Sequence, residues 1–178
     1  MPLCEIKDYL QIVYRGFDMS NVVVSFAEIS DAELLKDISV RGFKENFEKY
    51  GHYPPGLESI EWHQDKIKNE IYYKILYNSK IIGGAYLSQH PNHEMKIEFI
   101  FLSPDYHGKK IGTQVMTLIE GKHKKIKKWS LFTPYKDFRN HHFYEKLGYL
   151  KVGEIKPDES TDFILFHYEK EIRHHIKG

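Results

Sequence analysis

The chain has 178 residues, of which 41% are hydrophobic and 15% aromatic, and its formal net charge is +1. This length and composition predict a single domain with enough apolar side chains to fill a core. The near-zero charge argues against nucleic acid or a membrane surface as a partner, and the only cysteine, Cys4, excludes an intrachain disulfide. We expect a cytoplasmic protein, and the sequence leaves a homodimer open.

Residues 1–18 show no clear hydrophobic period, so we expect an N-terminal extension there and a single domain over residues 19–178. A β-branched run predicts the first strand, Val22–Ala27. Ser30, with a glutamate three residues later, has the spacing of a capping box. The helix that it starts is expected to continue through Tyr50.

The rest of the chain alternates between helical and strand patterns. Apolar residues at helical spacing predict helices, and β-branched or aromatic runs between turn residues predict strands. The pair Asn78-Ser79 predicts a hairpin turn. The expected helices are Leu57–Asn69, Lys109–Lys124 and Phe138–Leu147, and the expected strands are Ile71–Tyr77, Lys80–Ser88, Glu94–Leu102, Trp129–Thr133, Tyr149–Glu154 and Asp162–Glu169. This order predicts a mixed sheet flanked by helices.

The first stretch with chemical content follows the strand Glu94–Leu102. After a proline, the chain runs through His107-Gly-Lys-Lys-Ile-Gly112 into a helix. Exposed backbone N–H groups at a helix N-terminus bind anions, and a diphosphate suits them well. The stretch lacks the Gly-Lys-Ser/Thr of a Walker loop and the Gly-x-Gly-x-x-Gly of a Rossmann turn. On the loop alone, a plain helix N-terminus is an equally good interpretation.

The second stretch is Phe143-Tyr-Glu-Lys-Leu-Gly-Tyr149, in which a glycine ends a helix. Together the two stretches resemble the GNAT-type N-acetyltransferase superfamily. The family has Gln/Arg-x-x-Gly-x-Gly/Ala at the helix start, and here His107 stands at the Gln/Arg position, Lys110 at the first Gly and Gly112 at the last. Asp137 stands at the usual Asn position before the helix.

The resemblance implies the α/β (α+β) GNAT fold, which has a mixed and mostly antiparallel sheet flanked by helices. It implies acetyl-CoA as cosubstrate, no metal, and an amine-bearing acceptor that attacks the thioester directly. The strand Glu94–Leu102 would separate from its neighbour and pair with the amides of pantetheine. The cofactor-binding residues implied are Ile100, Phe101, Leu102, His107, Gly108, Lys109, Lys110, Ile111, Gly112, Thr113, Asn140 and Phe143.

Two residues are candidates for catalysis. The resemblance implies that the Tyr144 hydroxyl protonates the departing CoA thiolate, and the alternative is a packed helix tyrosine with a satisfied hydroxyl. Glu98 lies among apolar strand residues, where it could accept the proton of an ammonium acceptor, directly or through water. The alternative is a structural glutamate at a half-exposed strand position, paired with Lys96 or another cation. These two interpretations of Glu98 stay equally open.

Aromatic residues gather between the first two helices, in a region that rims the acceptor pocket in the resembling family. Tyr50, His52, Tyr53 and Trp62 could hold a cation by cation–π attraction, or they could simply pack in the core. Among the histidines, neighbours such as His141 and His142 point apart on a helix. No cysteine or carboxylate spacing completes a metal site.

Two other classes of function remain as alternatives. A non-catalytic acyl-CoA sensor is suggested by Lys110, because its side chain stands where the backbone must approach phosphate. A nucleic-acid-binding module rests only on the basic run Lys122–Lys128. That run also coincides with the expected end of a helix, where cations are favoured by the helix dipole.

Overall fold

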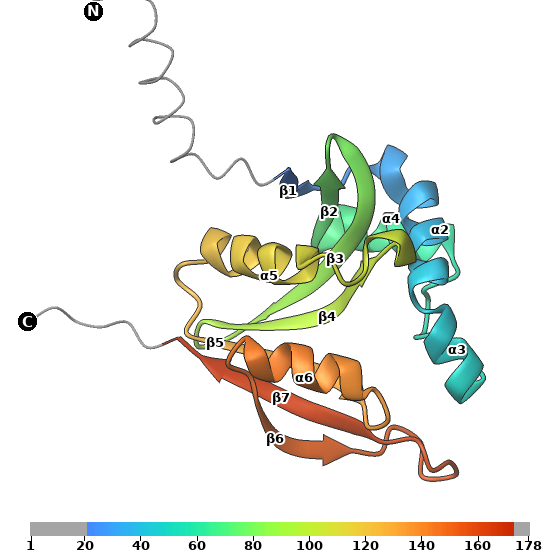
Figure 1. Cartoon of the computed structure of the whole chain (residues 1–178), viewed down its shortest axis with the longest axis vertical. Coiled ribbons are helices and arrows are strands. Elements are labelled where there is room, and N and C mark those ends of the chain that lie inside the picture. Colours follow the sequence, from blue (N-terminus) through green and yellow to red (C-terminus); the bar gives the residue numbers. More distant parts are fainter. Residues whose placement is uncertain (1–20, 173–178) are drawn as a thin grey trace, which may run out of the picture.

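The computed structural model describes residues 21–172, so the expected extension over residues 1–18 lies outside the described part of the chain. Within that part, seven strands form one sheet of order β1-β2-β3-β4-β5-β7-β6 (Figure 1). Only the neighbours β4 and β5 are parallel, and the other neighbours are antiparallel. The strands are β1 Val22–Phe26, β2 Ile71–Tyr77, β3 Lys80–His90, β4 Glu94–Leu102, β5 Lys128–Pro134, β6 Leu150–Ile155 and β7 Leu165–Glu171. The expected mixed, mostly antiparallel sheet is confirmed.

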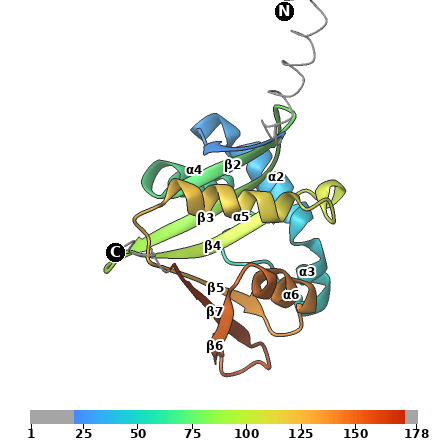
Figure 2. The ribbon, with the colours of Figure 1, turned by 60° about the vertical axis from the view of Figure 1, so that its left-hand side comes forward.

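Helices cover both faces of this sheet. They are α2 Ala32–Gly42, α3 Lys44–Tyr50, α4 Ile60–Asn69, α5 Ile111–Lys122 and α6 Phe138–Lys146, with short 3₁₀ turns at Ile29–Asp31 and Pro104–Tyr106. Helices α5 and α6 lie together on one face (Figure 2). Helices α2 and α4 lie on the opposite face, where they contact β2, β3 and β4. No helix among the described residues is both long and apolar enough to cross a membrane.

The first helical region differs from the expectation of one helix from Ser30 to Tyr50. The chain turns at Phe43, which separates α2 from α3. The Phe43 ring packs against Phe99 and Phe101 of β4, with ring centroids 6.2 and 6.5 Å away. This tertiary contact explains the break. Ser30 is not the cap. The capping box is formed by Glu28 and Asp31 around the preceding 3₁₀ turn, where the Asp31 carboxylate accepts the Glu28 N–H at 2.8 Å.

Other boundaries follow local chemistry. Helix α4 begins at Ile60 and not at Leu57, because the Ser59 hydroxyl accepts the N–H of Trp62 at 3.1 Å and caps it. The turn between β2 and β3 is confirmed, since Asn78 and Ser79 both have positive φ angles of 49° and 64°. Positive φ at both central residues matches the twist of a two-residue hairpin.

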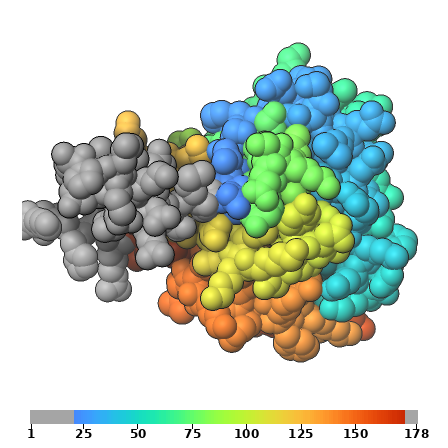
Figure 3. All heavy atoms as spheres, turned by 45° about the horizontal axis from the view of Figure 1, so that its top comes forward, coloured from blue at the N-terminus to red at the C-terminus, as the bar shows by residue number. Residues whose placement is uncertain are grey.

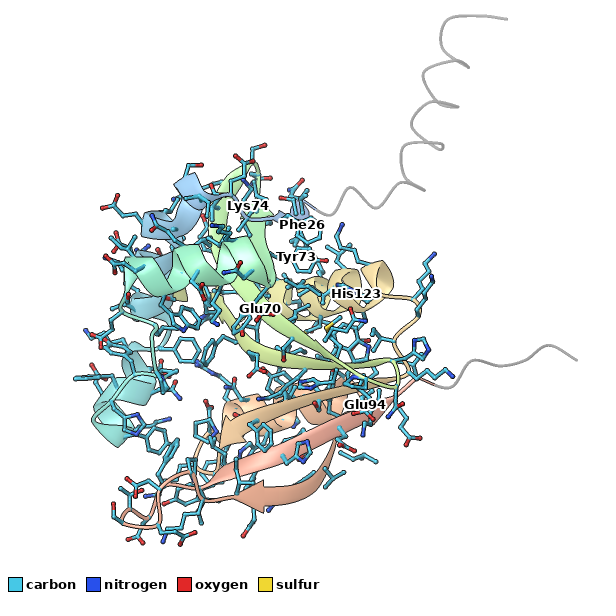
Figure 4. All side chains as sticks on the ribbon, turned by 180° about the vertical axis from the view of Figure 1, so that it is seen from behind. Phe26, Glu70, Tyr73, Lys74, Glu94 and His123 are labelled. Carbon is cyan, nitrogen blue, oxygen red and sulfur yellow. The ribbon has the colours of Figure 1, made fainter. Side chains whose placement is uncertain are left out.

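Two hydrophobic cores hold the layers. The larger core includes Ile97, Val115, Trp129, Tyr144 and Tyr149, and it joins the sheet to α5 and α6. The smaller core, of Leu35, Ile38, Tyr72 and Phe101, joins the sheet to α2. The C-terminal end of α5 is tied to β2 by a 2.9 Å hydrogen bond between the Tyr73 hydroxyl and His123 Nε2. Phe26 stacks on the other side of Tyr73, with ring centroids 4.8 Å apart (Figure 4).

Candidate functional site

The two parallel strands separate in the middle of the sheet. Strand β4 pairs with β5 only from Glu94 to Ile97, opposite Lys128 to Leu131. Beyond these residues β4 keeps its pairing with β3 and β5 keeps its pairing with β7, so the two strands diverge (Figure 1). The structure thus shows the separation that the family resemblance implied. On the side facing this opening, the backbone groups of both strands have no strand partner within residues 21–172.

Glu98 lies at the point where the strands separate. Its neighbours Ile97 and Phe99 pair with Leu87 and Tyr86 of β3, while Glu98 has no partner in the ladder and forms a bulge. Bulges bend a strand and redirect its side chains. Sequence patterning gave no indication of this bulge.

The Glu98 carboxylate is engaged on both oxygens. One oxygen accepts the Ser88 hydroxyl at 2.6 Å, and the other lies 2.7 Å from the Lys96 ammonium. The structural alternative for Glu98 was an ion pair with Lys96 or another cation, and the pair with Lys96 is present. The carboxylate side chain keeps 22% of its surface exposed, so it can still be reached from outside.

The loop after β4 leads into α5 through two residues with left-handed backbone conformation. Gly108 has φ 74°, and Lys110 has φ 59° and is the cap residue before Ile111, so α5 starts two residues later than expected. A left-handed backbone is the conformation that glycine adopts at no steric cost, which is a reason for glycine at the Lys110 position in the family. The first N–H groups of α5 have no acceptor within the helix and remain able to bind an anion.

One ring nitrogen of His107 is directed at the end of β4 and not at the anion-binding side of the loop. Its Nε2 lies 3.1 Å from the carbonyl of Leu102, to which it donates, so the ring ties the loop to the end of β4. Lys109 lies over the ring of Tyr106, with its ammonium 5.3 Å from the centroid. Thr113 is exposed one residue beyond Gly112. The anion-facing groups of the loop are therefore mainly backbone N–H groups and lysine side chains.

Helix α6 lies beside the start of α5. A Cβ atom at Gly112 would lie 3.2 Å from the Phe143 ring, so the glycine allows the two helices to approach. On the surface, the yellow segment that carries the loop before α5 adjoins the orange segment that carries α6 (Figure 3). The two motifs that are about thirty residues apart in sequence are neighbours in space.

The start of α6 is fixed by Asp137. Its carboxylate accepts the backbone N–H of Asn140 at 3.3 Å and the Asn140 side-chain amide at 2.8 Å. Asp137 thus serves as a helix cap at the position where the family has Asn. Asn140 already has this partner, so a contact with a cofactor would use its remaining donor or its amide oxygen.

Tyr144 is 6% exposed and packs against Phe143 and Tyr149. No hydrogen bond from its hydroxyl to another residue is found within residues 21–172. Burial raises the pKa of Tyr144 above its ordinary value, and the charge of Asp137 raises it further. The hydroxyl is therefore protonated at neutral pH and can donate a hydrogen bond, although it is a weak acid.

The structure gathers only part of the expected acceptor rim. A cavity of about 250 Å³ is lined by Lys49, Tyr50, His52, Tyr135, Lys136, Thr161, Asp162 and Phe163. The Phe163 ring contacts both Tyr50 and His52, at centroid distances of 5.0 and 5.2 Å. Sequence analysis missed residues 161–163, because they reach the cavity from the loop before β7 and carry no local signal.

Tyr53 and Trp62 do not line this cavity. Tyr53 stacks on Phe47 at 4.7 Å. Trp62 packs against Tyr86 and Phe99, and its ring lies so close to Gly56 that a Cβ atom there would come within 2.3 Å of it. The packing alternative accounts for both residues.

Another cavity, of about 470 Å³, lies near the C-terminal end of α5 between Glu120, His123 and Trp129. None of the expected site residues lines it. Within residues 21–172, no three His, Cys, Asp or Glu side chains gather in a way that could hold a metal ion. Lys128, the last residue of the basic run, is paired with Glu94 at 2.9 Å and Glu169 at 3.5 Å.

Comparison with known proteins identifies a matching family model and solved structures with a similar fold. Residues 33–149 match the model of the family described as "Acetyltransferase (GNAT) family". Over 82 residues the chain is 33% identical to YrkN of Bacillus subtilis (strain 168), and this match spans 44% of each protein, less than half of that relative's length.

Two solved structures illustrate the likeness of fold. The PaiA N-acetyltransferase from Thermoplasma acidophilum in complex with coenzyme A has a TM-score of 0.68 and 20% identity, over 85% of this chain and 99% of that one. The ribosomal-protein-S18-alanine N-acetyltransferase from Escherichia coli has a TM-score of 0.68 and 15% identity, over 86% and 95%. At such identities the likeness concerns the fold alone.

Proposed function

The chain belongs to the acetyltransferase (GNAT) family, and on this premise we propose that it transfers the acetyl group of acetyl-CoA directly to a primary amine. In the proposed step the amine nitrogen attacks the thioester carbonyl carbon and the carbon–sulfur bond breaks. The proton of the attacking nitrogen leaves to a base, and the CoA sulfur leaves as a thiolate that receives a proton. No covalent enzyme intermediate forms.

The separation of β4 from β5 beyond Ile97 and Leu131 is the observation that carries this proposal. Free backbone groups on a strand edge bind an extended ligand that carries amides, in the manner of an added strand. The acyl-pantetheine arm of acetyl-CoA is such a ligand. The start of α5 lies at the end of the same strand, where its N–H groups suit the diphosphate.

We assign the cosubstrate to the residues that the resemblance implied. The arm would contact Ile100, Phe101 and Leu102 on β4. The diphosphate would lie against the segment His107–Thr113, with Asn140 and Phe143 beside it on α6. A backbone N–H near Ile100 would polarise the thioester carbonyl.

Tyr144 and Glu98 are the proposed acid and base. The unpartnered Tyr144 hydroxyl would donate to the developing thiolate. Glu98 lies at the opening of the strands and would accept the amine proton through water, while Lys96 and Ser88 hold its carboxylate in place. The alternative, that Glu98 serves only to pair Lys96, is kept for experiment.

The acceptor would enter by the 250 Å³ cavity at Tyr50 and His52. The Tyr50 hydroxyl is buried and makes no well-formed hydrogen bond among the described residues, although the Lys136 backbone lies near it, so an acceptor group could provide a partner. Aromatic rings favour a cationic amine, while Lys49 and Lys136 favour a second, anionic group on the same molecule.

The test combines binding with turnover. Calorimetry with CoA should show binding, and free thiol should appear when acetyl-CoA is mixed with a suitable amine. The panel should include a polyamine, a lysine-like small amine, an amine-bearing antibiotic and a peptide that begins with alanine. Binding of CoA without turnover on the whole panel would favour an acyl-CoA sensor. A salt-dependent shift of DNA, without CoA binding, would favour the basic run Lys122–Lys128 as a nucleic-acid surface.

A further inference from the structure

Two buried side-chain polar atoms among residues 21–172 have no hydrogen-bond partner, the hydroxyl oxygens of Tyr50 and Thr133. Both are found around the C-terminal end of β5. Thr133 lies on that strand, and Tyr50 shares a cavity with Tyr135 and Lys136, which follow it. Buried polar groups in native proteins nearly always have partners, so each exception requires an explanation.

Thr133 is 2% exposed and lies two residues beyond Leu131, the last β5 residue that pairs with β4. On its other side β5 continues to pair with β7, where Thr133 is opposite Phe166. The residue therefore belongs to the part of β5 that borders the opening between the parallel strands. Its backbone is held by β7, and among the described residues no strand pairs with it on the β4 side.

The direction of the Thr133 side chain follows from strand alternation. Trp129, Leu131 and Thr133 are buried, while Lys128, Ser130 and Phe132 between them are only partly buried. Alternate residues share a face of a sheet, so Thr133 points to the face that Trp129 and Leu131 cover. These two residues belong to the same core as Tyr144 of α6 and Ile111 of α5. The Thr133 hydroxyl thus faces the layer that holds the proposed diphosphate loop and Tyr144.

Packing alone does not require a hydroxyl here. Valine has nearly the shape of threonine, and its two methyl groups would fill the same volume in an apolar layer without leaving a polar atom unsatisfied. An unpartnered hydroxyl destabilises the folded protein. A hydroxyl with no partner in the described part of the chain, beside an opening suited to an amide-bearing arm, is instead explained by a ligand that supplies the partner.

We propose that the Thr133 hydroxyl binds the acyl-pantetheine arm of acetyl-CoA, by a hydrogen bond to an amide or thioester group between β4 and β5. A threonine hydroxyl both donates and accepts, so either end of an amide can serve. This role rests on the proposed function and adds a side-chain contact from β5 to the backbone contacts from β4. Thr133 is a cosubstrate-binding residue in this assignment and takes no part in proton transfer.

Thr133→Val should raise the stability of the free protein and lower its affinity for CoA. The variant should be more stable than the wild type in the absence of ligand, with a higher midpoint in urea, because a buried unsatisfied hydroxyl has been removed. It should bind CoA about 3- to 10-fold more weakly, as expected for one lost hydrogen bond. Thr133→Ser, which keeps the hydroxyl, should retain most of the wild-type affinity.

Comparison of ligands locates the contact. Weaker binding of both CoA and acetyl-CoA by Thr133→Val would place the hydrogen bond on a pantetheine amide, and weaker binding of acetyl-CoA alone would place it on the thioester. Both results support the assignment. If Thr133→Val does not fold, Thr133→Ser and Thr133→Ala replace it, since these two smaller residues differ by the hydroxyl alone.

Other outcomes overturn the assignment. A Val variant that is stabilised but binds CoA and acetyl-CoA as tightly as the wild type would show that the hydroxyl does not contact the cosubstrate. A Val variant that is destabilised would show that the hydroxyl already has a partner in the free protein. In both cases the wild type still binds CoA, so the proposed function survives. A wild type that binds neither ligand would overturn the proposed function along with this assignment.

Discussion

Tyr144 shows how one buried side chain can combine a structural and a chemical role. Its ring belongs to the larger core, while its hydroxyl has no protein partner among the described residues. Burial raises the pKa of the hydroxyl, which keeps the proton in place at neutral pH. The same shift makes complete proton transfer to a thiolate unfavourable, since a thiol has a pKa near 8–9. We therefore expect Tyr144 to assist mainly by hydrogen bonding to the leaving sulfur.

Tyr144→Phe should lower kcat by about 100-fold, the low end of general-acid effects. Packing of the ring is kept, so the affinity for CoA and the thermal stability should stay close to wild type. Because the leaving thiolate is common to every reaction, the loss should be similar across acceptor amines in steady-state assays of thiol release. A defect confined to the KM of one amine would remove Tyr144 from the chemical step.

Tyr149→Phe is the matched control for this change. Tyr149 contacts the Tyr144 ring, but its hydroxyl donates to Glu120 at 3.0 Å and faces the other end of α5. Loss of this hydrogen bond should reduce stability by about 1 kcal/mol and leave kcat nearly unchanged.

Glu98 and Lys96 form a pair whose members can be tested separately. If Glu98 is the base, Glu98→Gln should lower turnover mainly near neutral pH, with partial recovery at high pH where more of the amine is unprotonated. The measurement is a pH profile of kcat/KM. Lys96→Gln breaks the same ion pair but keeps the carboxylate, so it should retain the acidic limb of the profile. Equal profiles for the wild type and both variants would make the pair structural.

At the scale of elements, helix α5 differs between its two ends. Its first turn follows two left-handed residues and lies against α6, while its last turn is tied to β2 through His123. Glycine occurs near both ends, at Gly112 and Gly121. A Cβ atom would contact Phe143 at the first position and would meet nothing within 4 Å at the second.

Gly112→Asp should weaken CoA binding at least ~10-fold in calorimetry, because it brings a negative charge to the proposed diphosphate site and crowds Phe143. Gly121→Asp introduces the same residue at the far end of the same helix. It should leave CoA affinity unchanged and cost stability by about 0.3–1 kcal/mol from the helix dipole. Equal affinities in the two folded variants would contradict the placement of the diphosphate.

Helix α4 is joined to the sheet by a buried histidine. His63 is fully buried, and its Nε2 lies 2.9 Å from the Leu57 carbonyl while its Nδ1 lies 2.8 Å from the Tyr72 hydroxyl. The carbonyl only accepts, so Nε2 carries the proton and Nδ1 accepts from Tyr72. Burial lowers the pKa of His63, because a charged ring cannot be solvated there.

The sign of the resulting pH dependence follows from linkage. The unfolded chain binds a proton at His63 below about pH 6.5 and the folded protein does not, so folding stability should fall as the pH drops below that value. One such group contributes at most about 1.4 kcal/mol per pH unit. Urea titrations between pH 7.5 and 5 should show this loss, and His63→Gln should show a smaller one. His123, whose pKa burial also lowers, acts in the same direction in both proteins.

At the scale of the whole molecule, the sheet consists of two parts joined by a short parallel ladder. Strands β1 to β4 form one part and β5, β7 and β6 the other, with the link between Glu94–Ile97 and Lys128–Leu131. The larger core crosses this link near Ile97, Trp129 and Leu131, which holds the two parts together while their far ends separate. The opening is therefore a consequence of the strand geometry and needs no separate domain.

The sequence by itself determined the type and order of the elements, because periodicity, caps and turn residues act over a few neighbours. The hairpin at Asn78-Ser79, the bounds of β4 and the helix that carries Tyr144 were all predictable in this way. The two motifs were also sufficient to indicate the family. Where a distant contact competes with a local pattern, as at Phe43, the prediction failed.

Only the tertiary structure decided how the site is assembled, because contacts between residues far apart in sequence leave no local pattern. It placed Glu98 in a bulge beside Lys96 and Ser88, brought Phe163 to Tyr50 and His52, and packed Tyr53 and Trp62 outside the cavity that these three residues line. The unpartnered hydroxyl of Thr133 has the same origin. In the sequence it is one residue of an apolar strand, and only the separation of β4 from β5 makes it the border of an opening.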